Sequence, residues 1–482
     1  MALSRIWAAF ILIAVLVAGY KSFSGQDQDI ISRMVSGKAS DAYDTVYYQP
    51  VAPLPEGFAR KVSAYGYLPA DSLHAPAIAL GPRGTDYQGN LSFLTFTQLE
   101  SRLTRHTDGI IETSKTAVNL SIGLIGIMAL FMGFMAIAEA AGGIRLLSRM
   151  IGPFFGRLFP EVPKGHPAFG HMMMNFSANL LGLDNAATPF GLKAMESLQE
   201  LNPDKERASN PQLMFLCLHA SGLTLIPVSI IAMRSALGAG NPTDIFVPCM
   251  IATFVATLAA MSIVAFKQGI RLFQPVILAW VGGISAVIAL LVVYIVRLNA
   301  AEVQSFSSTL SNGLILLIFL LIILGALYKK INIFDAFVSG AKGGFEVAVR
   351  IIPYLVGMLV AISMLRSSGA FDVAVQGIRS LFLALGTDTR FVDAMPTALI
   401  KPLSGSGARG MMVDTMQTFG VDSFAGRLSG VLQGSSDTTF YVVAVYFGAV
   451  SIRNTRYAIG AMLLADLVGV ITAVLVAYLF FG

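Results

Sequence analysis

The chain has 482 residues, of which 55% are hydrophobic and 13% are charged, and its mean hydropathy is +0.70. Soluble globular domains carry about 25% charged residues, so this composition excludes an ordinary soluble protein and indicates several membrane spans. The net charge of +5 is small and scattered, which favours Lys and Arg at cytoplasmic helix ends over a nucleic-acid-binding surface. Cys217 and Cys249 both lie in apolar segments, and we expect neither a disulfide framework nor a thiolate metal site.

Nine apolar segments are predicted as membrane spans, covering residues 5–21, 117–141, 212–234, 245–266, 275–297, 312–328, 345–366, 430–449 and 458–481. The first could be a cleaved signal peptide, but no A-x-A-like site follows it, and we interpret it as an uncleaved span. The sequence therefore predicts an all-α membrane protein.

A polar segment, residues 22–116, separates the first two spans. It contains Pro-rich and Gly-rich pieces and an amphipathic stretch near residues 97–111. Two interpretations stay open, namely a small extramembrane insert with some structure and a flexible loop.

The charges of the short loops predict the topology. Lys329 and Lys330 mark a cytoplasmic loop, whereas the loop 298–311 has neither Lys nor Arg and should be external. Counting outward from these loops, we expect a cytoplasmic N-terminus and an external insert, with the protein in the cell inner membrane among lipids.

The chain contains two related halves. Ser221 corresponds to Ser435 and Thr224 to Thr438, just as Asn185 corresponds to Ser406. Matched spans lie five apart in the order of spans, so the halves should have opposite orientations and form an inverted repeat. The predicted organisation is a first helix (1–21), the external insert (22–116), a first half (117–272), linking helices (273–330) and a second half (331–482).

Each half also contains two short helical stretches around a glycine-rich break, at residues 166–199 and 390–419. Neither stretch is long enough to cross a bilayer alone. We interpret both as re-entrant helical hairpins, which persist at membrane depth only where protein or a water-filled cavity satisfies the backbone. The alternative is an amphipathic hairpin on the membrane surface.

Polar residues gather at these hairpin breaks and at a second break in each half, at residues 219–224 and 433–439. Thr188 and Pro189 can begin a half-helix whose free amides point a partial positive charge at a ligand. Paired broken helices in related halves indicate a small-molecule or ion site. The residues predicted to line it are Asp184, Asn185, Thr188, Ser404, Ser406, His219, Ser221, Thr224, Gln433, Ser435, Ser436, Asp437 and Thr438.

These residues also have structural interpretations. Asp184 could merely cap a helix, and a lone His219 on an apolar span could be a packing residue. Serine and threonine in such helices often bond to a carbonyl one turn earlier. Asp437 is different, because a carboxylate at membrane depth costs roughly 3 kcal/mol on insertion scales. We hypothesise that it binds a coupling ion, sodium or a proton, or accepts a hydrogen bond from a solute.

Other charged residues occupy equivalent positions in the two halves. Glu139 corresponds to Arg366, and Lys193 corresponds to Asp414. These opposite charges could pair across the repeat axis or could be solvated helix ends. Asp466 lies inside the last span and needs a partner, for which the candidates are Arg453, Arg456 or a hairpin residue.

Catalytic signatures are not evident. The chain shows no activated nucleophile, HExxH motif, P-loop or dinucleotide fingerprint. We therefore expect neither an enzyme nor a resident cofactor or metal.

Several long strings resemble the spore maturation protein families. Residues 158–164, 175–195 and 223–227 resemble spore maturation protein A, and residues 350–356, 401–408 and 433–441 resemble spore maturation protein B. The chain thus looks like a fusion of the two, over residues 1–21 and 106–482. The resemblance implies a pair of nucleoside-recognition, or gate, domains, similar to segments of concentrative nucleoside transporters and ferrous-iron permeases. In spore formers it implies a part in dehydration of the spore core.

Three functional hypotheses follow. The leading one is a transporter or permease of a small polar solute, nucleoside-like or another metabolite, with a possible coupling cation. The alternatives are a non-transporting scaffold that regulates envelope or peptidoglycan maturation, and a divalent-cation permease built on hard oxygen ligands. Assembly into a homo-oligomer stays open.

Overall fold

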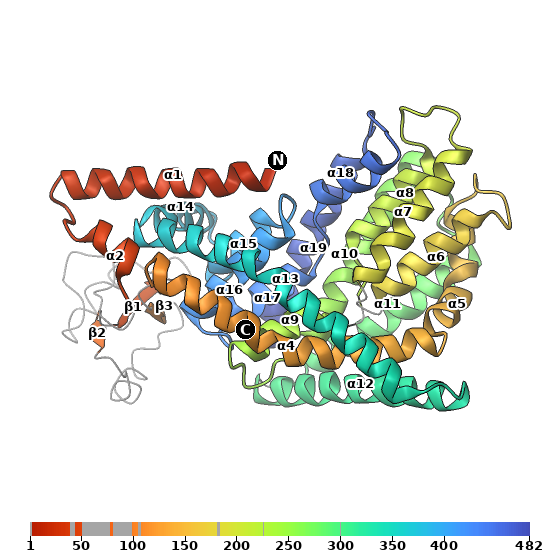
Figure 1. Ribbon diagram of the computed structural model, residues 1–482, viewed down its shortest axis with the longest axis horizontal. Helices are drawn as coiled ribbons and strands as arrows, with labels where there is room; N and C mark the ends of the chain where they lie inside the picture. The colour runs from red at the N-terminus through yellow and green to blue at the C-terminus, as the bar shows by residue number, and fades with distance from the viewer. Residues whose placement is uncertain are drawn as a thin grey trace. The chain divides into compact units, whose positions relative to one another are not determined.

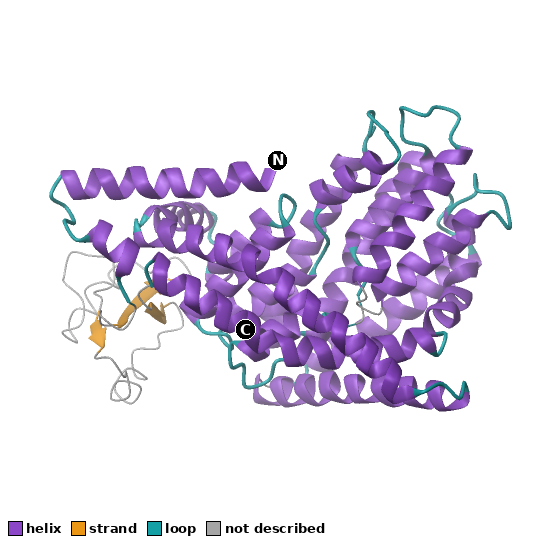
Figure 2. Ribbon diagram, in the orientation of Figure 1, coloured by secondary structure: helices purple, strands orange, loops and turns teal. Residues whose placement is uncertain are grey.

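Helices dominate the computed structural model of the chain (Figures 1 and 2), as the composition predicts. The structure describes residues 2–38, 44–50, 78–80, 99–104, 108–180, 184–224, 226–298 and 300–482. The chain divides into two compact units, each assembled from segments that are far apart in the sequence. The first comprises Met1–Leu120, Ile352–Thr397 and Arg409–Ser429, and the second comprises Ser121–Ile351, Ala398–Ala408 and Gly430–Gly482.

The first unit holds the N-terminal helices and a small sheet. Its own elements are α1 (Ala2–Phe23), α2 (Ile30–Ser36), β1 (Asp44–Pro50), β2 (Ile78–Leu80), β3 (Leu99–Thr104), α14 (Ala370–Ala384) and the 3-10 helix η3 (Arg390–Ala394). The central strand β1 pairs antiparallel with both neighbours, and Thr45 lies opposite Thr104. The described parts of the insert are therefore folded, which favours the structured interpretation. The Pro-rich piece near residues 49–55 lies almost entirely outside the described residues.

The second unit holds most of the apolar helices. Its own elements are α5 (Gly143–Leu158), α6 (Pro167–Leu180), α7 (Asp184–Leu201), α8 (Asn210–Ser221), α9 (Val228–Ala236), α10 (Phe246–Gln268), α11 (Pro275–Ile295), α12 (Ala300–Tyr328), α18 (Thr439–Ala449) and α19 (Ala458–Phe481). Five helices continue from one unit into the other, namely α4 (Ile110–Ala140), α13 (Ile333–Ser367), α15 (Met395–Ile400), α16 (Gly405–Phe419) and α17 (Phe424–Gly434).

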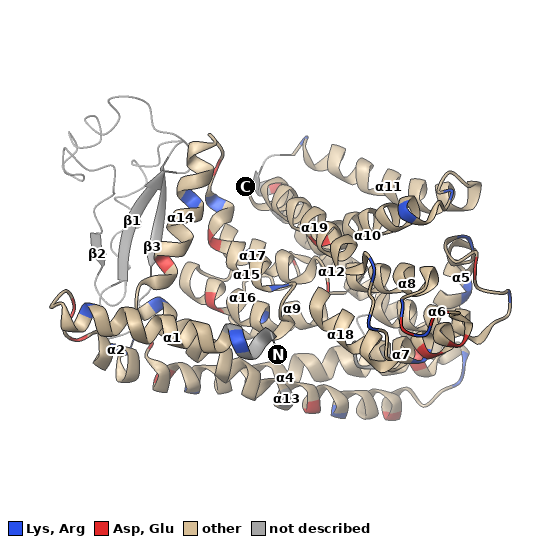
Figure 3. Cartoon of the chain, turned by 90° about the horizontal axis from the view of Figure 1, so that it is seen from above, with Lys and Arg blue, Asp and Glu red and all other residues tan. Residues whose placement is uncertain are grey.

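Six helices of the described chain are long and apolar enough to cross a membrane. They are α4, α10, α11, the Ser305–Tyr328 part of α12, α13 and α19. Figure 3 shows long helical stretches without charged residues. The structure does not confirm the count of nine spans. Residues 7–23 form a shorter apolar helix, and the segments predicted as spans at 212–234 and 430–449 are each interrupted.

The helices α11 and α12 leave most of their apolar surface outside the protein core. Only 6% of the most apolar 18-residue stretch of α11 is buried inside the protein, and 17% of the corresponding stretch of α12 is buried. Hydrocarbon is the solvent in which such a surface is stable, so these two helices are suited to face lipid.

The elements of the two halves follow the same order. In the first half, α4 ends before Gly142, whose φ of 85° is left-handed, and the amphipathic α5 follows. In the second half, α13 ends before Gly369, whose φ is 77°, and the amphipathic α14 follows. Glycine is favoured at both positions because it adopts positive φ without steric cost. The remaining elements then correspond one by one, from α6 to α10 and from α15 to α19.

Corresponding helices run antiparallel where they meet in the second unit. Gln268, at the end of α10, donates to Tyr457 Oη, just before α19, over 3.0 Å. Near the middle of both helices, a Cβ added to Gly469 would lie 3.2 Å from the Cβ of Ala256. Helices α10 and α19 therefore pack side by side in opposite directions.

The same relation holds between α4 and the part of α13 in the second unit. A Cβ on Gly344 would lie 2.6 Å from the Met128 carbonyl oxygen, and a Cβ on Gly340 would collide with the backbone of Met132. Going along α13 to later residues thus means going along α4 to earlier ones, so the two helices are antiparallel. The two glycines are four residues apart, the small-residue spacing that lets membrane helices approach closely.

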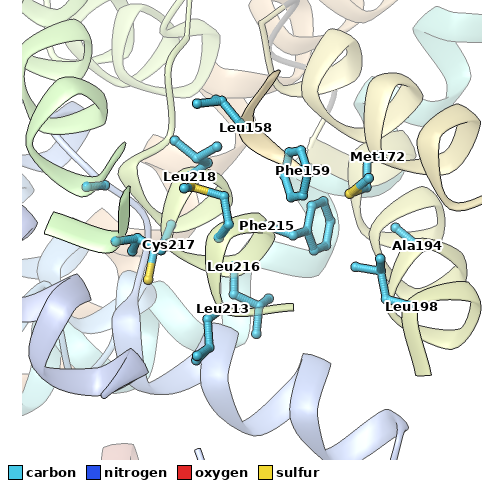
Figure 4. Close-up of a cluster of buried hydrophobic side chains, with 14 of the residues drawn as sticks. Leu158, Phe159, Met172, Ala194, Leu198, Leu213, Phe215, Leu216, Cys217 and Leu218 are labelled. Atoms are coloured by element: carbon cyan, nitrogen blue, oxygen red, sulfur yellow. The ribbon is translucent and has the colours of Figure 1, made fainter. Parts of the chain in front are cut away.

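A cluster of buried apolar side chains joins α5, α6, α7 and α8 (Figure 4). Leu158, Met172, Leu198 and Phe215 contribute one side chain from each of these helices. Further members lie on α10, α18 and α19. This packing fixes α8 against the hairpin of α6 and α7.

Candidate solute-binding site

The first broken helix, α8, has a strong start and an abrupt end. Its N-cap is Ser209, whose side chain and backbone exchange hydrogen bonds with Gln212 in a capping box. The helix ends at Gly222, which has φ 61° and ψ 43°. The Ser221 hydroxyl donates to the Leu218 carbonyl over 2.8 Å, and the chain resumes a helix only at Val228.

The second broken helix repeats this arrangement. Helix α17 ends at Gly434, and the Ser435 hydroxyl donates to the Leu432 carbonyl over 2.9 Å, the equivalent of the bond made by Ser221. Residues 435–438 are not helical, and α18 begins at Thr439. The predicted positions of both interruptions are therefore confirmed.

The two breaks are in direct contact. The Asp437 amide donates to the Ala220 carbonyl over 2.7 Å. A Cβ on Gly222 would lie at an ordinary contact distance of 3.5 Å from the same amide nitrogen, so glycine is favoured here by its left-handed φ of 61° and not by lack of space. A carbonyl at the end of α8, which lacks an intrahelical partner, is thus satisfied by the break of the other half. We call residues 219–222 and 435–438 the crossing.

His219 connects the crossing to the first hairpin. Its Nδ1 lies 3.1 Å from Asn175 Oδ1 and 2.9 Å from Asn179 Nδ2, both on α6. Asn175 also donates its amide to the Ala187 carbonyl on α7 over 2.6 Å. The other ring nitrogen, Nε2, lies 3.9 Å from Asp437 Oδ2. His219 is buried, whereas the Asp437 side chain is 47% exposed.

Aromatic rings line one side of His219. The Tyr446 ring lies 4.8 Å away between centroids, and the Phe215 ring lies 6.1 Å away. Gly191 makes room for this arrangement, because a Cβ there would lie 2.8 Å from Tyr446 Oη and from Asn175 Nδ2. Within the described chain, Tyr446 Oη is buried without a well-aligned hydrogen-bond partner.

Residues of the second hairpin also contact residues at the crossing. Lys401 Nζ donates to the Gln433 carbonyl over 2.6 Å, and a Cβ on Gly405 would lie 2.7 Å from Thr438 Oγ1. The Ser404 hydroxyl accepts the Gly407 amide at the start of α16 and lies 3.3 Å from the Ser406 hydroxyl. Among the described residues, Gln433 Oε1 is buried without a hydrogen-bond partner.

Asp466 of α19 lies beside this second break. Its carboxylate accepts a hydrogen bond from Thr439 Oγ1 over 2.6 Å. The expected arginine partners lie elsewhere. Arg453 pairs with Glu206 at 3.5 Å, and Arg456 donates to the Ala208 carbonyl. A threonine hydroxyl, and not an arginine, donates to the buried carboxylate.

The predicted site residues fall into four groups. The crossing and the second hairpin bring together His219, Gln433, Ser436, Asp437, Thr438, Ser404 and Ser406. Three hydroxyls bond to the nearby backbone, as the structural alternative proposed, namely those of Ser221, Ser435 and Thr224. Thr188 and Pro189 do not begin a helix, because α7 begins at Asp184, and Thr188 is half-buried near Tyr446. The side chains of Asp184 and Asn185 lie outside the described part of the structure.

Arg366 and Asp414 pair with each other, and not across the halves. In the first unit, Arg366 Nε lies 2.9 Å and 3.1 Å from the two carboxylate oxygens of Asp414, and both side chains are buried. The equivalent Glu139 and Lys193 are exposed. The Arg366 and Asp414 pair therefore supports the packing of α13 against α16 and is not a solvated helix end.

Sequence reasoning did not assign a role to Lys401, Asn175, Asn179 or Tyr446. A lysine between apolar helical segments was an available signal, because an ammonium at membrane depth needs a partner. The role of the two asparagines depends on the tertiary position of His219. As for metals, the described residues contain no group of three or more His, Cys, Asp or Glu side chains placed to hold an ion.

Comparison with known proteins places this sequence in a family. Residues 121–265 and 348–453 match the family model described as Gate, nucleoside recognition. Spore maturation protein B of Bacillus subtilis (strain 168) is 47% identical over 173 residues, which are 36% of this chain and 96% of that protein. Spore maturation protein A of the same organism is 39% identical over 170 residues, 35% of this chain and 87% of that protein. No solved structure matches significantly. The chain thus belongs to the nucleoside-recognition, or Gate, family, as a relative of both spore maturation proteins that is consistent with their fusion.

Proposed function

We propose that this protein binds a small polar solute at the crossing and carries it across the cell inner membrane. The observation that carries the proposal is the contact between the two helix breaks, in which the Asp437 amide bonds to the Ala220 carbonyl. Interrupted helices in both halves of a membrane protein are the usual location of transport sites. Non-helical backbone at membrane depth is tolerated where it is buried in protein or lines a water-filled cavity.

The polar groups at the crossing favour a solute that donates hydrogen bonds. The Asp437 carboxylate is an acceptor, and the buried Gln433 Oε1 is an acceptor without a partner in the described chain. His219 Nε2 is 3.9 Å from Asp437, which is too long for a hydrogen bond and leaves both groups able to bind a third. Hydroxyl and amide groups of a nucleoside or a similar metabolite satisfy such a site.

We further propose the arrangement in the membrane that this activity requires. The hairpins of α6 with α7 and of α15 with α16 would be re-entrant, and the two halves would form an inverted repeat. The antiparallel pairs α10 with α19 and α4 with α13 support the inversion. The N-terminus would then be cytoplasmic and the insert external, as the positions of the positive loops favour.

Replacing Asp437 by Asn tests this function. The substitution keeps the size of the side chain and removes its charge, so solute recognition should be lost while the fold persists. We expect cells with Asp437→Asn to show the same changes in an untargeted metabolite comparison as cells that lack the protein. Asp388→Asn is the matched control, because Asp388 pairs locally with Arg390 on the first unit. Full complementation by Asp437→Asn would contradict the proposal.

A second candidate function is a scaffold that regulates envelope enzymes, and the folded sheet of the insert favours it. In that case deletion of residues 22–105 should abolish the cellular phenotype, and Asp437→Asn should leave it intact. The opposite pattern supports solute transport.

A further inference from the structure

The two faces of helix α5 have different surroundings. Its inner face packs on α6, where the Ser148 hydroxyl lies 3.1 Å from the Ser177 hydroxyl. On the same face the Phe155 ring stacks on the Phe176 ring, with 4.5 Å between centroids. The outer face is one continuous strip that holds the exposed residues of the helix, namely Arg145, Leu146, Arg149, Met150, Pro153, Gly156 and Arg157.

Three arginines concentrate positive charge on this outer face. Arg145 and Arg149 are one turn apart, and Arg157 follows about two turns later. The helix contains neither Asp nor Glu, and within the described chain none of the three guanidinium groups pairs with a carboxylate. Guanidinium groups bind phosphate oxygens through paired hydrogen bonds, so the face suits a partner that carries phosphate groups.

A row of apolar side chains lies beside the arginines. Leu146 is 60% exposed and Met150 is 51% exposed, and each directly follows an arginine in the sequence. The protein core does not cover them, because the inner face of α5 is the one that packs on α6. A bilayer surface satisfies both rows at once, since headgroup phosphates meet the arginines and the acyl boundary receives the apolar side chains. Free phosphate would leave Leu146 and Met150 in water.

The direction and surroundings of α5 agree with a position at the membrane surface. Gly142, with a left-handed φ of 85°, turns the chain between α4 and α5, and α5 then runs across the direction of the apolar helix α12 (Figure 1). Phe154 lies 6.5 Å between centroids from Trp280, near the start of α11. Tryptophan is enriched where a span meets the headgroups. We propose that the outer face of α5 lies in the membrane interface and binds the headgroups of anionic phospholipids.

The corresponding helix of the second half lacks this arrangement. Helix α14 contains one arginine, Arg379, which is buried and donates to Asp393 over 2.6 Å. The charged residue that α14 exposes is Asp372. The repeat alone therefore does not require a row of exposed arginines, and the attraction to anionic lipid is a property of the first half.

Lipid binding by the purified full-length protein tests the proposal. Thermal unfolding in a neutral detergent would be followed with added phosphatidylglycerol, phosphatidylcholine or inorganic phosphate, and bound lipid would be counted by native mass spectrometry. We expect phosphatidylglycerol alone to be retained and to raise the Tm, by roughly 2 °C or more. Combining Arg145→Gln, Arg149→Gln and Arg157→Gln should weaken the binding of phosphatidylglycerol roughly tenfold or more, because each arginine near a headgroup adds attraction.

The matched control combines Lys329→Gln, Lys330→Gln and Lys342→Gln, which removes the same charge from exposed positions elsewhere on the second unit. It should keep the native preference for phosphatidylglycerol. Arg145→Gln with Arg149→Gln replaces the triple arginine variant if that variant does not fold, with the same direction of effect. Equal losses in the arginine and lysine variants would overturn the proposal, as would equal stabilisation by phosphatidylcholine or a rise in Tm with inorganic phosphate alone.

Discussion

The two ring nitrogens of His219 lie in different surroundings. Asn175 and Asn179 both lie within hydrogen-bond reach of Nδ1, so that nitrogen is used in either tautomer. The nitrogen that faces Asp437 is Nε2, and a hydrogen-bonded partner on one ring nitrogen fixes the orientation of the other. Helix α6 of the first hairpin thus orients the His219 side chain, although α6 itself is not part of the crossing.

Asn175→Ala tests this positioning. The substitution leaves the Ala187 carbonyl and one bond of His219 unsatisfied in a buried environment, and each such loss costs about 1–3 kcal/mol. We expect a clear fall in the Tm of the purified protein together with loss of the cellular activity. Asn119→Ala makes the same chemical change at an exposed position of α4 and should leave both unchanged. Equal Tm values for the two variants would show that Asn175 does not hold His219.

At this scale, sequence reasoning identifies candidate residues from local chemistry, and their role in binding stays a prediction. The residues of the second break and His219 were predicted from polar side chains in apolar helices, and the structure brings them together. It assigned no role to Lys401 because its partner, the Gln433 carbonyl, is 32 residues away. A single helix cannot show which distant backbone group a side chain reaches.

At the scale of elements, apolar length predicted the continuous helices well and the interrupted ones only in part. The segments 212–234 and 430–449 are apolar enough to span a membrane. Hydropathy alone does not reveal that the helices are interrupted at Gly222 and at residues 435–438. The glycine and hydroxyl content of the same segments does predict the breaks, because such residues leave a helix easily. The strands of the insert were not predicted, since their pairing joins segments separated by long loops.

Packing of α4 against α13 gives a prediction at this scale. A Cβ at Gly344 would press on the backbone of Met128 and Ala129, which cannot move away as a side chain would. We expect Gly344→Ala to destabilise the protein by about 1–3 kcal/mol, the usual cost of overpacking. Gly343→Ala is the adjacent control, with no atom within 4 Å of the new Cβ, and should be neutral or slightly stabilising. The comparison of their Tm values decides whether close backbone contact holds these helices together.

At the scale of the whole molecule, the account depends on two halves of opposite orientation that bring their broken helices into contact. Repeated residues predicted this relation, and the matching order of elements from α4 to α10 and from α13 to α19 agrees with it. Sequence could not predict which corresponding helices touch. That outcome depends on small residues such as Gly469, whose lack of a side chain lets α19 approach α10 near Ala256.

Cross-linking of paired cysteines tests the opposite orientation most directly, in a background where Cys217 and Cys249 are replaced by Ala. An antiparallel arrangement predicts that Gln268→Cys with Tyr457→Cys is joined by a short bismaleimide, because these side chains are in contact. A parallel arrangement through the same contact of Ala256 with Gly469 would instead bring residue 268 to residue 481. Linkage of the 268 and 457 pair alone is the predicted result, and linkage of Gln268→Cys with Phe481→Cys alone would contradict the account.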